Sequence, residues 1–345
     1  MNPIALMIFL LSLVLGTTIV LMSHHWLLAW IGLEINTLAI IPLMTKFPHP
    51  RAIEASTKYF LTQASASALV LFSSTMNAWL TGEWDITSMS NELFSTTLSL
   101  ALMLKLGLAP LHFWLPEVLQ GVPLSTGLIL STWQKIAPMT LLLQISHLLN
   151  LNLLILMGLL SILIGGWGGI NQTQIRKIMA FSSIGHLGWM IIILKFNPQL
   201  TLFSFSLYIA MTTAMFLSLM STSTTKMLEI AASWPKTPVL ITTTMLVLLS
   251  LAGLPPLSGF SPKLLITLEL IKQNTPTLAA ITTLASLIAL FFYTRLTYVI
   301  ILTLPPNTLN SSINWRINKI NPLTAIFSSA ALFIFPMTPT LFFIM

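Results

Sequence analysis

Four ionisable side chains lie inside long apolar stretches of this 345-residue chain, and they are the residues best suited to chemistry. Glu34 occurs in "WIGLEINTL", Lys105 in "LALMLKLGL", Lys135 in "STWQKIAPM" and Lys263 in "SGFSPKLLI". A charged side chain at the centre of a membrane-spanning helix costs about 2.5–3.5 kcal/mol. Four of them in one chain therefore indicate a shared polar interior.

Proton transfer is the chemistry that these four residues could perform. A low dielectric disfavours the ammonium form of a lysine, whereas a nearby carboxylate favours it. A glutamate and a lysine can thus exchange protons if their surroundings alternate between wet and dry. The alternatives are a static ion pair, or lysines that extend to the membrane surface. Lys105 and Lys135 lie too deep in their predicted spans to extend to the membrane surface. Lys263 lies in a longer predicted span, so the sequence defines its depth in the membrane less closely.

Two histidines are relay candidates, because imidazole titrates near neutral pH. His112 follows Lys105 by seven residues, inside a stretch that two prolines interrupt. His186 lies two apolar segments before a second interrupted stretch, as Glu34 lies two segments before the first. Either histidine could instead be a hydrogen-bonded core residue.

The elements that position these residues are membrane-spanning helices. The chain is 55% hydrophobic and 7% charged, whereas soluble domains are about 25% charged. Apolar runs of about 20 residues predict spanning helices rather than a barrel. The first run lacks a basic leader and passes into a second span, so no cleavable signal is expected. Eleven spans are predicted, at 3–22, 25–45, 55–80, 94–120, 124–146, 150–170, 177–196, 199–222, 238–272, 276–303 and 321–344.

Charge placement predicts the orientation of these spans. If the chain has eleven spans, four basic loops lie on the same side of the membrane as the N-terminus. The loop between spans 3 and 4 lies on the opposite side and is acidic. Because basic loops stay on the inner side, the N-terminus is expected there. The basic loops contain Lys46, Arg51 and Lys58; Arg176 and Lys177; Lys226 and Lys236; and Arg316 and Lys319. The opposite side has Lys195 and Lys272 near span ends and Glu83, Asp85 and Glu92 in its loop.

An internal repeat connects the two interrupted spans. "GLAPLHFWLPE" at 107–117 aligns without a gap with "GLPPLSGFSPK" at 253–263, and five positions are identical. The copies lie five spans apart, so they should cross the membrane in opposite directions. This pattern is typical of inverted repeats with broken helices near the midplane. Glu117 occupies the position of Lys263, near the expected end of its half-helix, and is a further relay candidate.

Redox and metal chemistry in this chain are not expected. The chain has no cysteine, so it offers no thiolate ligands for zinc or iron–sulfur clusters. Neither a metal site nor a cofactor site is predicted. "GGWGG" at 165–169 follows an apolar helix rather than a strand, which favours close helix packing over dinucleotide binding.

Four motifs, taken in order, resemble one family. "KLGLAPLHFWLPEV", "STWQKIAP", "QIRKIMAFSSIGHLGWM" and "GLPPLSGFSPK" are similar to the antiporter-like membrane subunits of respiratory complex I, the NADH:ubiquinone oxidoreductase. The resemblance covers essentially the whole chain. It implies an all-α fold of two inverted five-helix repeats with discontinuous helices. Many members have fourteen spans, and the animal mitochondrial form lacks the first three, which agrees with eleven spans and a matrix-side N-terminus.

The resemblance also implies roles and partners. Glu34 corresponds to the glutamate that pairs with the broken-helix lysine, Lys105 to that lysine, Lys135 to the central lysine, and Lys263 to the lysine of the second broken helix. His186 matches a relay position loosely. The implied partners are other membrane-arm subunits, accessory subunits and lipids such as cardiolipin, in the mitochondrial inner membrane. NADH, FMN, iron–sulfur clusters and ubiquinone belong to the complex as a whole and not to this chain.

Three readings of function follow from the sequence. The first is a proton-translocating subunit with halves at 1–146 and 147–303 and a C-terminal part at 304–345. The second is a stand-alone cation/proton antiporter subunit, whose transport would depend on sodium and not on NADH oxidation. The third is a structural spacer without proton transfer, in which the buried charges form static pairs.

Overall fold

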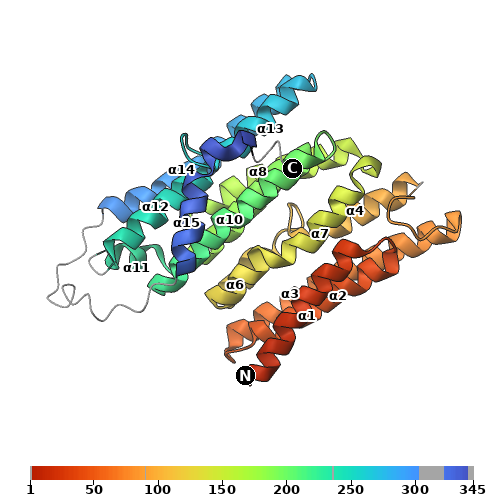
Figure 1. The fold of residues 1–345 in the computed structure, drawn as a ribbon, viewed down its shortest axis with the longest axis horizontal. Coiled ribbons are helices and arrows are strands. Elements are labelled where there is room, and N and C mark those ends of the chain that lie inside the picture. Colours follow the sequence, from red (N-terminus) through yellow and green to blue (C-terminus); the bar gives the residue numbers. More distant parts are fainter. Residues whose placement is uncertain (1, 90, 235–236, 303–321, 341–345) are drawn as a thin grey trace. The chain divides into compact units, whose positions relative to one another are not determined.

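The described part of the chain is helical. The computed structural model describes residues 2–89, 91–234, 237–302 and 322–340 (Figure 1), and within these ranges it contains no β-strand, only isolated bridges between His25 and Asp85 and between Gln174 and Lys226. The all-α prediction is confirmed. Lys236, Arg316 and Lys319, together with the end of the last predicted span, lie outside the described residues.

The helices follow the predicted apolar runs, and three of these runs are divided. In chain order they are α1 Pro3–Met22, α2 Trp26–Met44, α3 Pro50–Thr81, α4 Glu92–Leu106, α5 Trp114–Gly121, α6 Leu124–Ser131, α7 Trp133–Gln144, η1 Ser146–Leu148, α8 Leu151–Gly169, α9 Ile175–Ile193, α10 Pro198–Thr222, α11 Met227–Ala232, α12 Pro238–Ala252, α13 Phe260–Lys272, α14 Pro276–Leu302, α15 Pro322–Phe333 and η4 Phe335–Met337.

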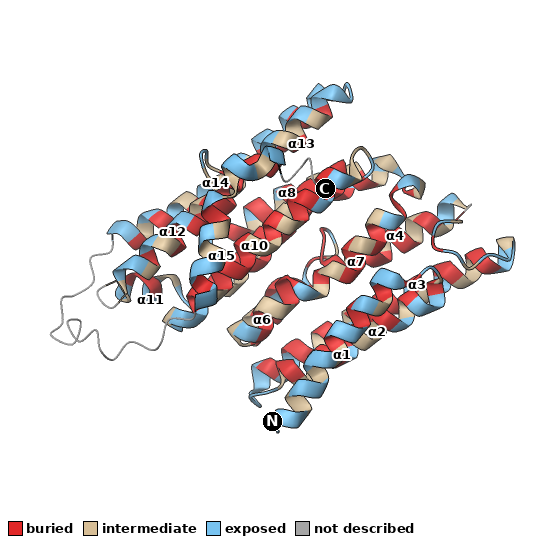
Figure 2. Cartoon of the chain, in the orientation of Figure 1, coloured by how far each residue is buried: buried red, intermediate tan, exposed pale blue. Residues whose placement is uncertain are grey.

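Five helices of the described ranges are long and apolar enough to cross a membrane. They are α1, α2, α8, α10 and α14. Large apolar side chains such as Ile8, Leu11 and Leu15 of α1 are exposed, and Figure 2 shows the same helix with an extensive exposed face. An apolar exterior is what a lipid-facing helix requires. The count of eleven crossings stays a prediction.

The chain forms two compact units, residues 1–160 and 161–345. In the first unit, α1 packs against α2, and α3 packs against α2, α4 and α5. Gly16 and Gly32 allow the close approach of α1 and α2, because a Cβ on either would lie 2.8–2.9 Å from the carbonyl oxygen of the other. In the second unit, α10 contacts α9, α12, α13 and α15. The functional halves at 1–146 and 147–303 stay a prediction.

The two broken helices have the same backbone plan. Both α4 and α12 contain 15 residues, and each ends at a glycine with a left-handed conformation, Gly107 (φ 77°) and Gly253 (φ 81°). Only glycine adopts this conformation without cost, so the two equivalent glycines of the repeat end the helices. Residues 107–113 and 253–259 then connect to α5 and α13. The discontinuity predicted for 94–120 and 238–272 is present, while the opposite orientation of the copies stays a prediction.

The fifth predicted span contains a break that the sequence did not indicate. The structure divides 124–146 at Thr132, whose hydroxyl donates to the Leu128 carbonyl at 2.7 Å. A hydroxyl bound to the preceding turn commonly bends a helix. The indole of Trp133 then donates to the Leu13 carbonyl of α1 at 3.4 Å. The break lies three residues before Lys135.

Candidate functional site

A buried cavity in the first unit brings Lys105 and Lys135 together. Lys105 lies in the last turn of α4 and Lys135 in the first turn of α7. Their side chains are 5% and 2% exposed, so neither extends to the surface. Polar side chains of α2, α3 and α7 complete the lining: Asn36, Thr37, Tyr59, Gln63 and Gln134.

Glu34 is the carboxylate associated with this cavity. It lies on α2, between the lining residues Leu33 and Asn36. Its charge acts electrostatically on Lys105 and on Tyr59, two residues that line the cavity. One carboxylate oxygen of Glu34 is buried, and neither it nor the Lys105 ammonium has a hydrogen-bond partner among the described residues. Glu34 and Lys105 are thus electrostatically coupled without being locked in a direct hydrogen bond.

Further polar atoms at this cavity lack protein partners in the described part of the chain. They are both amide atoms of Asn36 and the amide nitrogen of Gln63. A buried polar group without a hydrogen bond costs about 1–3 kcal/mol, and buried water commonly satisfies such groups. The cavity is large enough for water. Water bridging these groups would connect Glu34, Lys105 and Lys135 by hydrogen bonds.

Sequence reasoning missed the amide side chains at this site. Asn36 follows Glu34 by two residues, and Gln134 precedes Lys135 directly. Gln134 donates from its side chain to the Asn36 backbone carbonyl at 3.1 Å, which ties α7 to α2 beside the lysine. Both amides lie within apolar runs, and this was the signal in the sequence. Because an uncharged amide is less costly to bury than a charge, it indicates a functional site less strongly.

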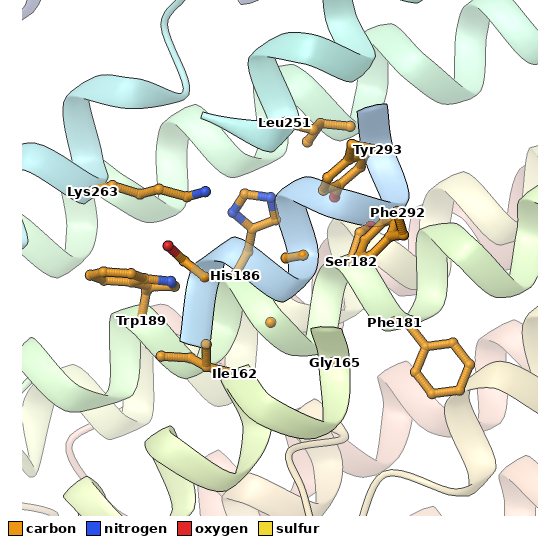
Figure 3. A pocket seen from close by; sticks show the side chains of 13 residues that line it. Ile162, Gly165, Phe181, Ser182, His186, Trp189, Leu251, Lys263, Phe292 and Tyr293 are labelled. Carbon is orange, nitrogen blue, oxygen red and sulfur yellow. The ribbon is translucent and has the colours of Figure 1, made fainter. Parts of the chain in front are cut away.

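A second cavity lies in the second unit and contains Lys263 and His186. Figure 3 shows the Lys263 ammonium directed toward the imidazole of His186, with Ser182 and Tyr293 on the same cavity. The Lys263 ammonium donates to the Ala252 carbonyl at 2.6 Å. This carbonyl belongs to the last residue of α12, where a cation interacts favourably with the helix dipole.

Lys263 therefore reaches back across its break. In the repeat, Leu251 takes the position of Lys105, and Leu251 lines the second cavity together with Lys263. Although Lys263 belongs to α13, its ammonium lies at the C-terminal end of α12. Lys105 lies at the corresponding end of α4. Each of the two cavities thus has a lysine associated with the last turn of the first half-helix, through the backbone position of Lys105 and through the ammonium of Lys263.

His112 and Glu117 do not line either cavity. His112 is buried in the first break, with Nδ1 3.3 Å from the Pro110 carbonyl and its ring against Phe113. Glu117 is half-exposed and forms an ion pair with Lys58 at 2.6 Å. Their relay roles stay predictions, and the position of Glu117 is that of a surface ion pair.

Replacing Glu117 with glutamine is expected to change proton translocation by less than about twofold. An exposed ion pair contributes about 0–1 kcal/mol, and Lys58 keeps Glu54 as a second carboxylate partner at 2.5 Å. Proton uptake by reconstituted vesicles measures the effect. If proton uptake fell as much as in Glu34→Gln, the result would instead support a role for Glu117 in proton transfer.

The interpretation of "GGWGG" as a helix-packing motif has a structural counterpart. The glycines of "GGWGG" pack closely: a Cβ on Gly165 would lie 2.7 Å from the backbone nitrogen of Gly185 on α9, and one on Gly166 would lie 3.1 Å from Ile288 on α14. Within the described ranges, no three histidine, aspartate or glutamate side chains gather as metal ligands.

Comparison with known proteins agrees with this geometry. Residues 23–289 match the family described as NADH:quinone oxidoreductase/Mrp antiporter, TM, and residues 290–342 match the NADH dehydrogenase subunit 2 C-terminus. NADH-ubiquinone oxidoreductase chain 2 of Aquarana catesbeiana is 71% identical over 342 residues, which cover 99% of each chain. The chain belongs to the NADH-ubiquinone oxidoreductase chain 2 family. The member from Xenopus laevis is 59% identical, over 98% of this chain and 99% of its own length.

Solved structures share the fold of this family member. A chain of respiratory complex I from Thermus thermophilus superimposes with a TM-score of 0.84 at 25% identity, covering 97% of this chain and 80% of that one. A chain of the Mrp complex from Dietzia sp. gives a TM-score of 0.84 at 16% identity, covering 97% and 73%. The second likeness concerns the fold alone. The antiporter-like fold predicted from the sequence is therefore confirmed.

Proposed function

We propose that this chain is a core membrane-arm subunit of NADH:ubiquinone oxidoreductase, respiratory complex I, and that it moves protons across the mitochondrial inner membrane. The observation that carries the proposal is the first-unit cavity, where two buried lysines meet a coupled glutamate among unsatisfied polar atoms. Such groups at membrane depth are costly and are retained for transport. Full-length similarity to the chain 2 relatives supports the same assignment.

The first half of the mechanism is an exchange between Glu34, Lys105 and Lys135. A change in the charge near Glu34 alters the stability of the ammonium form of Lys105, because the two charges interact. The released proton moves through cavity water to Lys135, which lines the same cavity. The amides of Asn36 and Gln63 offer hydrogen bonds to that water. His112, buried in the adjacent break, is a side branch of this path.

The second half of the mechanism passes the proton to Lys263 and His186. These residues share a cavity with Ser182 and Tyr293. Protonated Lys263 is held by the terminal carbonyl of α12 with its ammonium directed toward His186, and transfer of that proton to the imidazole leaves Lys263 as a neutral amine. The imidazole then passes the proton toward one face of the membrane.

The electron-transfer chemistry belongs to other subunits. NADH, FMN, iron–sulfur clusters and ubiquinone supply the redox energy of the complex, and this chain has no cysteine with which to ligate a cluster. The energy reaches the chain as an electrostatic change at Glu34. The chain is thus a subunit of a translocase and performs no redox step itself.

The N-terminus lies on the matrix side in this proposal. Within the second unit, the start of α9, which carries Arg176, and the segment that carries Lys226 are joined by backbone hydrogen bonds, Ile175 to Thr225 and Met227 to Thr173, so these two basic segments share one end. In the first unit, the acidic loop at Asp85 bridges to His25, at the end of α1 opposite the N-terminus. Both observations support the basic-inside arrangement.

The exposed apolar helix faces are the surfaces for membrane-arm neighbours, accessory subunits and lipids such as cardiolipin. Exposed side chains on α1 and α14 are long and apolar. In a membrane, such a face needs either acyl chains or another apolar helix against it.

Replacing Glu34 with glutamine tests the proposal. The substitution keeps the shape and removes the charge that acts on Lys105, so proton pumping and NADH:ubiquinone reduction are expected to fall together by roughly tenfold, a typical size for the coupling between two sites. Purified complex in liposomes, assayed for rotenone-sensitive NADH oxidation with simultaneous proton counting, gives both quantities.

Glu83→Gln is the matched control, because Glu83 is an exposed glutamate of the same unit. It should leave both rates unchanged. Full pumping in the Glu34 variant would favour the structural spacer, whereas transport that requires sodium and not NADH would favour the stand-alone antiporter.

A further inference from the structure

The second broken helix touches the C-terminal segment of the chain. This segment consists of α15 and η4, residues Pro322–Met337, and α15 packs on α10 and α12. Ser258, which is fully buried in the second break, donates from its hydroxyl to the Ala331 carbonyl. Phe260, the first residue of α13, lies against Phe335 with ring centroids 6.2 Å apart.

The Ala331 carbonyl is well suited to be an acceptor. It is one of the last four carbonyl groups of α15, which have no partner within their own helix. Because Ser258 is buried, loss of its hydroxyl would leave this carbonyl without a replacement donor nearby. The hydrogen bond therefore holds the break and the end of α15 in a fixed relation.

The other side of the break is pressed against α12. A Cβ on Gly259 would overlap the Ser250 carbonyl oxygen, so no space separates the loop from the helix. Three residues beyond Phe260, Lys263 reaches back to the Ala252 carbonyl at 2.6 Å. The start of α13 is thus held between α12 and the C-terminal segment, and this position determines whether the Lys263 ammonium meets the end of α12.

The first break is stabilised differently. The position of Ser258 is taken there by His112 and that of Phe260 by Trp114. The Trp114 indole donates to the Leu104 carbonyl at 3.1 Å and packs edge-on against Tyr59. The first break is therefore fixed by its own half-helix and by α3.

We propose that the C-terminal segment is a positioning element for Lys263, which acts by holding Ser258 and Phe260 of the second break in place. The inference rests on the proposed role of Lys263 in proton transfer. It assigns a task to the segment that matches the NADH dehydrogenase subunit 2 C-terminus: the segment sets the geometry of a proton-carrying lysine.

Ser258→Ala in the assembled complex tests the inference. Loss of one buried hydrogen bond corresponds to roughly a fivefold effect, so a fall of that size in proton pumping is expected, with normal amounts of complex. Ser261→Ala is the matched control. Ser261 is also buried, in the first turn of α13, but its hydroxyl donates only to the Ser258 carbonyl in the same turn. Pumping by the control should stay within twofold of the unmodified complex.

A double substitution separates positioning from general damage. If Ser258 acts through Lys263, then Ser258→Ala should add nothing to the defect of Lys263→Gln, whereas unrelated structural damage should add to it. Additive defects would overturn the inference. Phe335→Leu, which removes the ring contact, gives the same test if Ser258→Ala does not assemble.

The outcomes also distinguish this inference from the proposed function. A pumping defect in Lys263→Gln with none in Ser258→Ala and Phe335→Leu would overturn the positioning role alone. Normal pumping in Lys263→Gln would overturn the role of Lys263 in proton transfer, and the positioning inference with it.

Discussion

Replacing Lys105 with methionine is expected to lower proton pumping by about a hundredfold, which is the lower end of what a positioned proton-transfer group contributes. Methionine keeps a similar length and apolar stem but cannot bind a proton. In the first cavity, Lys105 is the lysine on which Glu34 acts. Without it, a change at Glu34 no longer reaches Lys135. Proton counting per NADH oxidised, in reconstituted vesicles, measures the loss.

The same variant separates transport from a structural role. A buried ammonium carries a desolvation penalty that methionine removes, and the Lys105 ammonium gives up no direct hydrogen bond, because it has none among the described residues. The amount of assembled complex should therefore be retained or increase. If Lys105 were half of a static pair, assembly would fall while the remaining complex pumped normally. Lys46→Met, at an exposed lysine of the same unit, should affect neither quantity.

The sequence predicts best those features whose cause is local. Gly107 and Gly253 end α4 and α12 because their backbone needs a left-handed conformation, and this requirement is visible in the repeat itself. Buried charges are equally visible, because an isolated lysine in an apolar run has few harmless explanations. Lys105 and Lys135 were assigned to one polar interior on that basis, and they line one cavity.

The sequence predicts least well those features that depend on distant partners. Glu117 pairs with Lys58, 59 residues away, and nothing in the sequence near either residue indicates this. The break at Thr132 depends on a hydroxyl that donates to a carbonyl group of the preceding turn. Whether a serine or threonine in a helix forms this hydrogen bond depends on the packing around it. Gln134 likewise finds its acceptor on α2, 98 residues earlier.

The two breaks show how one backbone plan can carry different residues. The position of Lys105 is occupied by Leu251 in the second copy, and that of Lys263 by Glu117 in the first. Nevertheless, the Lys263 ammonium binds the terminal carbonyl of α12. Both breaks therefore have a lysine associated with the last turn of the first half-helix, and in the second break the helix dipole and free carbonyl groups favour the Lys263 cation there. An alignment of residue types alone would have missed this equivalence.

Replacing Gly259 with alanine is expected to have the largest effect on stability in the second unit. The backbone of Gly259 is ordinary for a helix, so conformational strain is not the reason. An added Cβ would overlap the Ser250 carbonyl oxygen of α12. Backbone atoms cannot turn aside as side chains do, so the break must move away from α12, and such overpacking costs about 3 kcal/mol or more. The ammonium of Lys263 would then lose the Ala252 carbonyl.

Assembly and thermal stability of the complex test this expectation. Much less assembled complex, or a clearly lower unfolding midpoint, should accompany Gly259→Ala. Gly185→Ala is the matched control, because Gly185 lies inside α9 and a Cβ there would meet no atom within 4 Å. Alanine in a helix interior is favoured over glycine by about 1 kcal/mol, so the control should be at least as stable as the unmodified complex. Equal stability of the two variants would show that the loop at Gly259 has room to move, and that α12 does not constrain the start of α13.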